Sequence, residues 1–264
     1  MKSIATCGVL MPIGGAEDKH GERRVLRHFL ELCGGKRARV VVMPSASPSA
    51  AEVGEAYSTL FRGLGAANVD CLHIQDRREA NSQDTLALLK HATGIFMAGG
   101  DQLKLLGLIG GTGLASALRE AHRCGTHIAG TSAGASAMSR QMISSGRRGS
   151  QPVQRMVQMA AGLGLTNFII DQHFSQRDRM GRLITAVTLN PGSIGLGLDE
   201  DTALVMQPNG NWRLVGSGTV TVIDGRGMTF NDMYAAKSHE PFRVDGLDIR
   251  VLLAETTTTS PLLL

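Results

Sequence analysis

Short apolar runs alternate with segments of helical periodicity along almost the whole chain. The runs cover residues 3–15, 38–44, 68–74, 94–100, 126–130, 167–173, 193–199, 202–207 and 219–225. Between them, apolar residues recur three or four positions apart, as in Leu26, Phe29, Leu30 and Cys33, which predicts helices over 23–35, 50–65, 84–92, 113–125 and 178–188. Continuously apolar strands separated by helices are typical of parallel sheets that are buried on both faces. We therefore predict an α/β fold, with a mostly parallel sheet flanked by helices on both faces.

No linker, repeat or low-complexity stretch divides this pattern. We therefore expect one α/β domain over residues 1–264. The last residues, 255–264, are rich in threonine and end in three leucines, so we expect them to be frayed or to pack at an interface.

The composition excludes several classes of protein. Hydrophobic residues make up 42% of the chain and charged residues 19%, as in ordinary globular proteins. The net charge of +4 is spread along the chain without interleaved aromatic residues, which argues against a nucleic-acid-binding protein. Apolar stretches are too short for a membrane span, and neither a signal peptide nor a C-x-x-C pair is present. We expect a cytoplasmic protein in which Cys7 and Cys33, each within an apolar run, are buried.

The segment 128–139, IAGTSAGASAMS, contains a Gly-x-Ser-x-Gly motif centred on Ser132. Alone, such a motif is weak evidence, because a serine in a glycine-rich turn can simply cap a helix. Here an apolar strand precedes it and small residues that favour a helix follow it, which is the arrangement of a nucleophile elbow. Gly130 and Gly134 would allow the sharp turn and the close approach of strand and helix. We therefore interpret Ser132 as a candidate nucleophile.

A nucleophilic serine needs a base and an acid that orients the base. His173 is the last residue of the run 167–173, at the end of a predicted strand, and is the favoured base. The next predicted strand ends in Asp199, Glu200 and Asp201, and from the residues alone any of the three could be the acid. An α/β-hydrolase order would instead make His239 the base, although its segment is polar and poorly patterned.

Several motifs together resemble the cyanophycinase family of serine peptidases, which has a glutamine-amidotransferase-like α/β fold. They are GGAEDK (14–19), GGDQLKL (99–105), GTSAGASAMS (130–139), MVQMAAGLGL (156–165), DQHFSQRDRMGRL (171–183) and GLGLDEDTA (195–203). The family degrades cyanophycin, a poly-aspartate with arginine on each side-chain carboxyl group, to β-Asp-Arg dipeptides. The resemblance implies that Ser132 is the nucleophile, His173 the base and Glu200 the orienting acid, and it implies a homodimer.

That reaction also needs an oxyanion hole and groups that bind a substrate carrying both signs of charge. The N–H of Ala133 and one from the turn Gly99, Gly100 and Asp101 are the expected oxyanion donors. The expected substrate-binding residues are Gln102, Asp171, Gln172, Arg177, Arg179 and Arg182. The arginines could instead form a solvated helix surface with Asp178. In the absence of a His-Glu-x-x-His motif or a P-loop, we expect neither a metal nor a cofactor.

The basic segment 144–155 departs from the pattern expected of the family. Arg147 and Arg148 would repel the arginine side chains of cyanophycin if this loop lined the groove, so they could instead face solvent or a partner subunit. Two alternatives therefore stay open beside the cyanophycinase reading. One is a peptidase with the same triad acting on small aspartyl or isoaspartyl peptides, and the other is a binding protein without activity.

Overall fold

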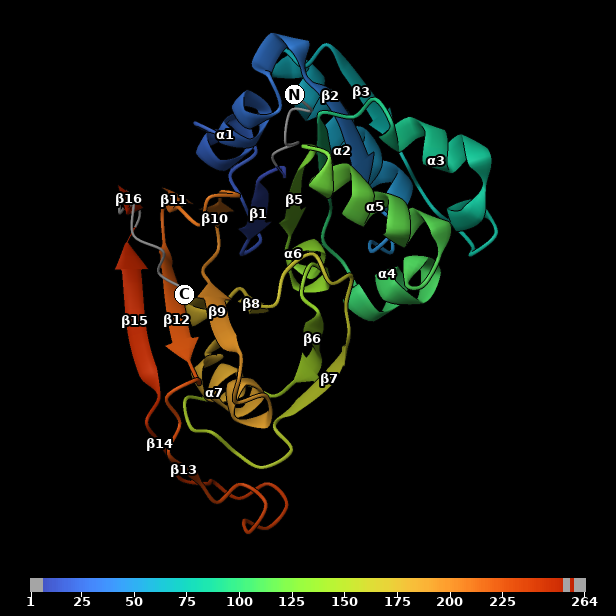
Figure 1. The fold of residues 1–264 in the computed structure, drawn as a ribbon. Helices are drawn as coiled ribbons and strands as arrows, with labels where there is room; N and C mark the ends of the chain where they lie inside the picture. The colour runs from blue at the N-terminus through green and yellow to red at the C-terminus, as the bar shows by residue number, and fades with distance from the viewer. Residues whose placement is uncertain (1–6, 254–256, 259–264) are drawn as a thin grey trace, which may run out of the picture.

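A computed structural model describes residues 7–253 and 257–258 of the chain. It contains a large mixed sheet, a smaller four-stranded sheet and two short β-ribbons, with helices packed around them (Figure 1). The large sheet has the strand order β16 (Thr257–Thr258), β11 (Trp212–Gly216), β10 (Thr202–Met206), β1 (Leu10–Ile13), β5 (His127–Thr131), β4 (Gly94–Met97), β2 (Arg39–Met43) and β3 (Asn68–Cys71). From β1 to β3 neighbouring strands are parallel, whereas β10, β11 and β16 continue the sheet antiparallel.

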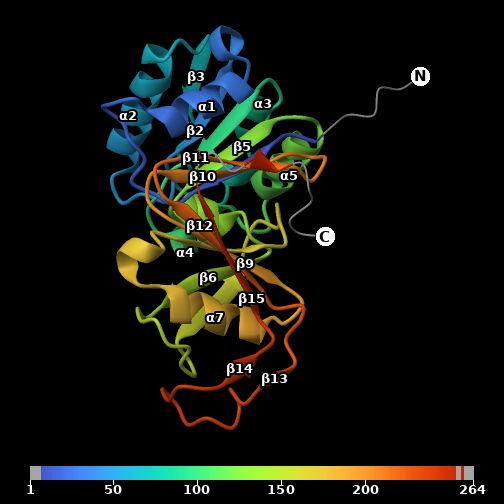
Figure 2. The ribbon, with the colours of Figure 1, turned by 90° about the vertical axis from the view of Figure 1, so that its left-hand side faces the viewer.

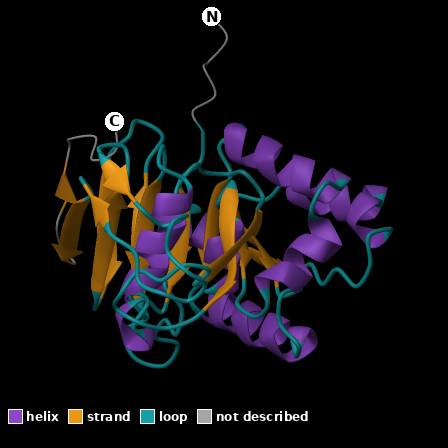
Figure 3. Ribbon diagram, turned by 90° about the horizontal axis from the view of Figure 1, so that it is seen from below, coloured by secondary structure: helices purple, strands orange, loops and turns teal. Residues whose placement is uncertain are grey.

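Helices cover both faces of the parallel strands, as the sequence predicts (Figure 3). The helices α1 (Arg24–Leu32) and α2 (Ala50–Gly63) pack on one face, where they bury Phe29 and Phe61 against Phe96. The opposite face is covered by α3 (Gln83–Leu89), α4 (Gln102–Ile109) and α5 (Gly113–Arg123), together with the short α6 (Ala133–Ala137). Single 3₁₀ turns occur at η1 (Gly35–Arg37), η2 (Glu79–Asn81) and η3 (Ser175–Arg177).

The small sheet has the order β15 (Asp248–Leu253), β12 (Thr219–Asp224), β9 (Ile194–Leu198) and β8 (Ile169–Gln172). One of its faces extends the main core, because Leu196, Leu198 and Val220 pack in the same cluster as Ile128 of β5. The other face is covered by α7 (Met180–Leu189), which also contacts the ribbon β6 (Gln141–Gly146) and β7 (Val157–Ala161). Below α7, the chain forms the ribbon β13 (Phe230–Asn231) and β14 (Val244–Asp245) (Figure 2).

Two expectations from the sequence differ from the structure. Cys33 is buried as expected, but Cys7 is exposed, because β1 begins only at Leu10 and Cys7 precedes it. The basic segment 144–155 is not wholly a loop, since β6 extends through Gly146. Of the tail 255–264, only Thr257 and Thr258 lie within the described residues; they pair with β11.

Candidate active site

Ser132 lies on a sharp turn between β5 and α6. Its backbone angles, φ 52° and ψ −112°, are rare for a residue with a side chain and place the hydroxyl group above the end of the strand. A Cβ atom on Gly130 would lie 2.5 Å from the carbonyl oxygen of Gly134, and one on Gly134 would lie 2.3 Å from that of Met97. Both glycines are therefore required by close approach of the backbone, as the motif suggested.

His173 follows β8 and reaches across to the serine. Its Nε2 atom lies 2.9 Å from Oγ of Ser132, and its Nδ1 atom lies 2.6 Å from Oε1 of Glu200, which follows β9. Because a carboxylate only accepts hydrogen bonds, it holds the proton on Nδ1 and leaves Nε2 free to accept from the serine hydroxyl. The three residues thus form a continuous chain of hydrogen bonds.

The environment of His173 keeps its imidazole neutral. Burial lowers its pKa below the usual 6.5. The hydrogen bond that Nδ1–H donates to Glu200 raises the pKa, and the charges of Arg177 and Arg179 lower it further. A neutral imidazole near pH 7 can take a proton from a hydroxyl group, which is the requirement for a general base.

The neighbours of Glu200 have other partners. Asp199 accepts hydrogen bonds from Ser175 and Thr219, and Asp201 accepts them from the backbone of Asp18 and from Ser217. Of the three acids that the sequence left open, Glu200 is the one in contact with His173.

The other candidate histidine, His239, is exposed. Its Nδ1 atom lies 2.7 Å from Arg147 of the basic segment. Arg148 is also exposed. Two backbone hydrogen bonds hold this segment. The N–H of Gly149 donates to the carbonyl oxygen of Asp178, and the N–H of Gln154 donates to that of Glu240.

The loop at 14–19, after β1, packs against His173. The carbonyl oxygen of Gly14 accepts the backbone N–H of His173 at 2.7 Å. Gly15 has φ 99°, and a Cβ atom there would lie 2.4 Å from Cε1 of the His173 ring. The ring therefore packs directly on the glycine backbone, which fixes its position.

Glu17, on the same loop, is a buried residue that the sequence did not single out as functional. Its carboxylate accepts hydrogen bonds from the hydroxyl groups of Tyr57 and Thr131, the latter at 2.6 Å, and Nζ of Lys19 lies 3.4 Å away. Thr131 immediately precedes the candidate nucleophile, so Glu17 fastens the loop to the end of β5. A glutamate in a glycine turn resembles an ordinary helix-capping residue in sequence, and only the tertiary structure reveals these partners.

Two residues of the predicted oxyanion hole, Ala133 and Gly99, lie next to Ser132. Ala133 is the first residue of α6, where the backbone N–H has no acceptor within its own helix. Gly99 is close to the serine, since a Cβ atom there would lie 3.3 Å from Cβ of Ser132. The N–H of Asp101 already donates to the carbonyl oxygen of Ala46 at 2.9 Å, and its carboxylate caps α4. This turn therefore offers Gly100 rather than Asp101 as a free donor.

The six predicted substrate-binding residues fall into two groups. Asp171 is fully buried and forms a bidentate pair with Arg182, while Nη1 of Arg179 lies 3.2 Å from the same carboxylate. Gln102 donates to the carbonyl oxygens of Ile143 and Ser144 and so holds β6.

The second group lies nearer the nucleophile. Oε1 of Gln172 lies 3.4 Å from Oγ of Ser132 and 3.0 Å from Nη1 of Arg179. Burial lowers the pKa of the Arg179 guanidinium to about 10, so it stays charged at neutral pH. Its Nε atom is buried without a hydrogen-bond partner among the described residues. Arg177, on η3, is half-buried.

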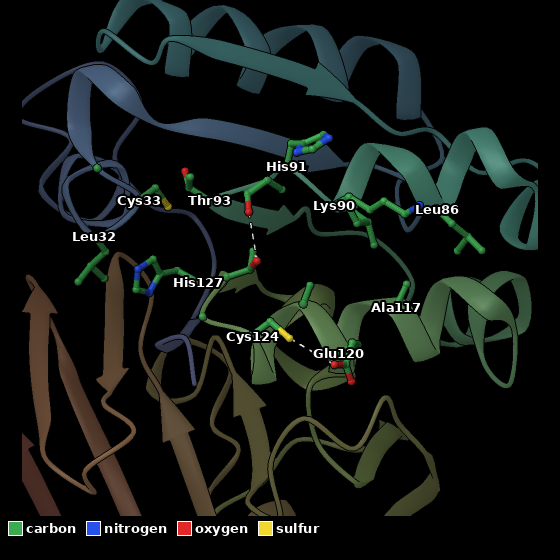
Figure 4. A pocket seen from close by; sticks show the side chains of 16 residues that line it. Leu32, Cys33, Leu86, Lys90, His91, Thr93, Ala117, Glu120, Cys124 and His127 are labelled. Atoms are coloured by element: carbon green, nitrogen blue, oxygen red, sulfur yellow. Dashed lines mark hydrogen bonds between the residues drawn. The ribbon is translucent and has the colours of Figure 1, made fainter. Parts of the chain in front are cut away.

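Figure 4 shows a cavity of about 790 Å³ that includes His127, the first residue of β5, so it lies at the opposite end of this strand from Ser132. It is lined by the amino-terminal ends of β4 and β5, including Thr93 and His127, and by Cys33, Leu89 and Cys124. Ligands of parallel α/β sheets bind at the carboxyl ends of the strands, where Ser132 and His173 lie, so this cavity is separate from the candidate active site.

Within residues 7–253 and 257–258, no group of His, Cys, Asp and Glu side chains is arranged to hold a metal ion. None of the helices described there is long and apolar enough to cross a membrane.

Comparison with known proteins identifies the family. Residues 9–212 match the model of peptidase family S51. The chain belongs to this family. It is 40% identical over 250 residues to a protein named cyanophycinase from Trichormus variabilis, covering 94% of this chain and 84% of the relative. It is also 40% identical over 247 residues to the cyanophycinase of Synechococcus elongatus, covering 93% and 77% of the two chains. The chain is thus a serine-type peptidase.

Solved structures agree on the fold. A peptidase from an acI-B1 actinobacterium matches with a TM-score of 0.67 at 22% identity, covering 97% of this chain and 98% of that one. A putative peptidase E from Listeria monocytogenes matches with a TM-score of 0.53 at 19% identity, covering 76% and 95%. The α/β architecture predicted from the sequence is confirmed.

Proposed function

We propose that this peptidase hydrolyses cyanophycin as an exopeptidase and releases β-Asp-Arg dipeptides, with Ser132, His173 and Glu200 as its catalytic triad. The observation that carries the proposal is the pair of contacts at His173, 2.9 Å to Ser132 and 2.6 Å to Glu200. The relatives named cyanophycinase support the choice of polymer. The exopeptidase mode, the cytoplasmic location and the homodimer expected from the sequence belong to the same proposal.

The reaction begins when Nε2 of His173 takes the proton of Ser132 and Oγ attacks the scissile carbonyl carbon. Glu200 holds the imidazole in the required tautomer and stabilises the imidazolium ion that forms. The oxyanion accepts hydrogen bonds from the N–H groups of Ala133 and Gly100, which are fixed by α6 and by the turn after β4. His173 then gives its proton to the leaving amine, and water hydrolyses the acyl-enzyme by the same route.

Substrate recognition uses the charged groups beside the nucleophile. We assign direct contacts with the polymer to Gln172, Arg177 and Arg179, because Gln172 lies 3.4 Å from Ser132 and the charges of Arg177 and Arg179 act on His173. The guanidinium groups of Arg177 and Arg179 suit the free carboxylate of a β-Asp-Arg unit. Asp171, Arg182 and Gln102 would then act through these residues, since their polar atoms are already paired within the protein.

The experiment is the release of soluble product from insoluble cyanophycin, followed by mass spectrometry. The wild type and the control Ser116→Ala, a serine on α5 away from the triad, should both release β-Asp-Arg. Ser132→Ala should lower the rate by at least about a thousandfold, because the triad acts as a unit.

The alternatives give different results. If the wild type leaves the polymer intact and cleaves a β-aspartyl dipeptide in a manner that depends on Ser132, the triad holds but the substrate does not. If the wild type cleaves neither substrate, the assignment of Ser132 as a catalytic nucleophile is wrong.

A further inference from the structure

A second cavity, of about 510 Å³, lies where β8 and β9 begin. Phe168, which directly precedes β8, and Ile194, the first residue of β9, both line it. His173 and Glu200 follow the other ends of these two parallel strands. The cavity therefore lies one strand length away from the candidate active site, and the reaction proposed above does not use it.

Most polar side chains around this cavity have unused hydrogen-bond donors. Four of those that line it form no hydrogen bond or ion pair with another described residue: Arg140, Gln141, Asn167 and Ser193. Arg140 is exposed and stands between α6 and β6. Guanidinium, amide and hydroxyl groups can all donate hydrogen bonds to an oxygen atom of a ligand.

Arg226 adds a second guanidinium group to the cavity. Its Nε and Nη2 atoms lie 3.0 and 2.8 Å from the carboxylate of Asp224, whereas Nη1 binds nothing in the described part of the chain. Neither Asp224 nor any other described aspartate or glutamate lines the cavity. Because the lining holds two guanidinium groups and no carboxylate, it favours an anionic group as ligand.

We propose that this cavity, which we call the arginine pocket after Arg140 and Arg226, binds the carboxylate of a cyanophycin unit remote from the unit being cleaved. The inference rests on the proposed function. Each unit of the polymer has a free carboxylate, and guanidinium groups match its two oxygen atoms. An exopeptidase holds only the end of the chain at its nucleophile, so the remaining units pass over the surface and can be bound there.

The guanidinium group of the bound unit also finds partners in the pocket. The half-buried ring of Phe168 lines the cavity, and a guanidinium group binds favourably over an aromatic face. The side-chain oxygen atoms of Gln141 and Asn167 can accept its hydrogen bonds. The pocket therefore accommodates both charges of the unit, which offsets the repulsion between its guanidinium group and the two arginines.

The length of β8 sets the shortest chain that can reach both sites. The strand has four residues, and Phe168 and His173 flank its ends, so these two residues are about 15 Å apart at about 3.3 Å per residue. A peptide backbone covers at most about 3.6 Å per residue, so two polymer units span about 7 Å. A two-unit chain therefore occupies the active site alone, whereas the polymer can occupy both sites.

The test measures adsorption to suspended cyanophycin with inactive enzyme, so that the polymer is not degraded. Ser132→Ala should adsorb, and its combination with Arg140→Ala should raise the apparent Kd by about tenfold, because a hydrogen-bonded charge pair is lost. The control combines Ser132→Ala with Arg37→Ala, which removes an exposed arginine on η1 outside the pocket, and it should adsorb like Ser132→Ala. Equal adsorption of the Arg140 and Arg37 variants overturns the proposal.

Turnover of a soluble two-unit chain separates the pocket from the active site. With Ser132 intact, Arg140→Ala should cleave this chain with the kcat and KM of the wild type, which also shows that the variant is folded. A loss there as large as the loss of adsorption overturns the proposal, because Arg140 would then act through the active site or the fold. If the wild type does not degrade the polymer, the proposed function fails and the arginine pocket fails with it. Failure of the pocket alone leaves degradation by the wild type intact.

Discussion

The Nε2 atom of His173 lies 2.9 Å from Oγ of Ser132, and both residues have a positive φ, 49° for His173 and 52° for Ser132. Such conformations cost about 1–3 kcal/mol each and persist only where the surrounding structure imposes them. Here the constraint comes from Gly14, which accepts the N–H of His173, and from Ile13, which accepts the N–H of Ser132 at 3.0 Å. One short segment of β1 and its loop thus fixes both partners.

Substitution of the acid should change the pH dependence of the reaction. The proposed mechanism needs neutral His173, so kcat/KM should fall as the pH drops through the pKa of His173, which burial places below 6.5. Glu200 raises that pKa, so Glu200→Gln should move the acid limb of the profile to lower pH. The maximal rate should also fall by about 10⁴-fold, because the tautomer is no longer fixed.

The control for this experiment is Asp201→Asn, which changes the neighbouring acid. Asp201 binds the backbone of Asp18 and the side chain of Ser217, so the variant should lose some stability and keep the position of the acid limb. An acid limb that moves with Asp201→Asn and not with Glu200→Gln would show that the wrong acid has been assigned.

A methyl group on Gly15 should inactivate the enzyme. The added Cβ atom would lie 2.4 Å from the His173 ring, so the ring must move away from Ser132. A displacement of about 1 Å can cost about a hundredfold in rate, and we expect at least that loss in kcat for Gly15→Ala. Gly164→Ala is the matched control, because its φ is 68° and the added Cβ atom meets open space. Equal activity of the two variants would contradict the packing argument.

Asp171 should contribute strongly to stability. It is fully buried between two guanidinium groups, and removal of one partner of a buried ion pair costs about 3–5 kcal/mol. We expect Asp171→Ala to lower the free energy of unfolding in urea by that amount, and the surface pair variant Asp248→Ala to change it little. Unchanged stability with a raised KM would instead show that Asp171 binds substrate directly.

Tyr57→Phe should destabilise the loop that carries Glu17. The phenol donates to the buried carboxylate, and a hydrogen bond to a charged group contributes about 1.5–3 kcal/mol. The same loss should appear in the free energy of unfolding, measured in urea against the wild type. If Tyr57→Phe is as stable as the wild type, the carboxylate of Glu17 has a sufficient set of partners without the phenol.

Local patterns predicted the parts of the site that follow single strands. Ser132 could be found because glycine spacing, an apolar strand and small helical residues all point to one turn. His173 and the acidic group at 199–201 could be found because each ends an apolar run. The choice of Glu200 needed the family resemblance, since three adjacent acids have the same local signal.

Other features depend on residues far apart in the chain. Asp171 and Arg182 were both predicted to bind substrate, but they pair with each other. No local pattern in the sequence distinguishes a charge that is paired inside the protein from one that is exposed to a ligand. The ribbon β6–β7 contains polar and glycine residues typical of loops, and it is held by tertiary contacts such as Gln102 to Ile143. The second sheet was not separable from the first, because its strands have the same apolar character.

The residues of the proposed triad are divided between the two sheets: Ser132 follows β5 of the large sheet, whereas His173 and Glu200 follow β8 and β9 of the small one. The distance between Oγ of Ser132 and Nε2 of His173 therefore depends on how the two sheets pack against each other. Mild heat or denaturant that separates the two sheets would therefore abolish the activity even if every strand remained intact. In this fold, the turnover rate should therefore report a change in the packing of the two sheets that a measurement of secondary-structure content would miss.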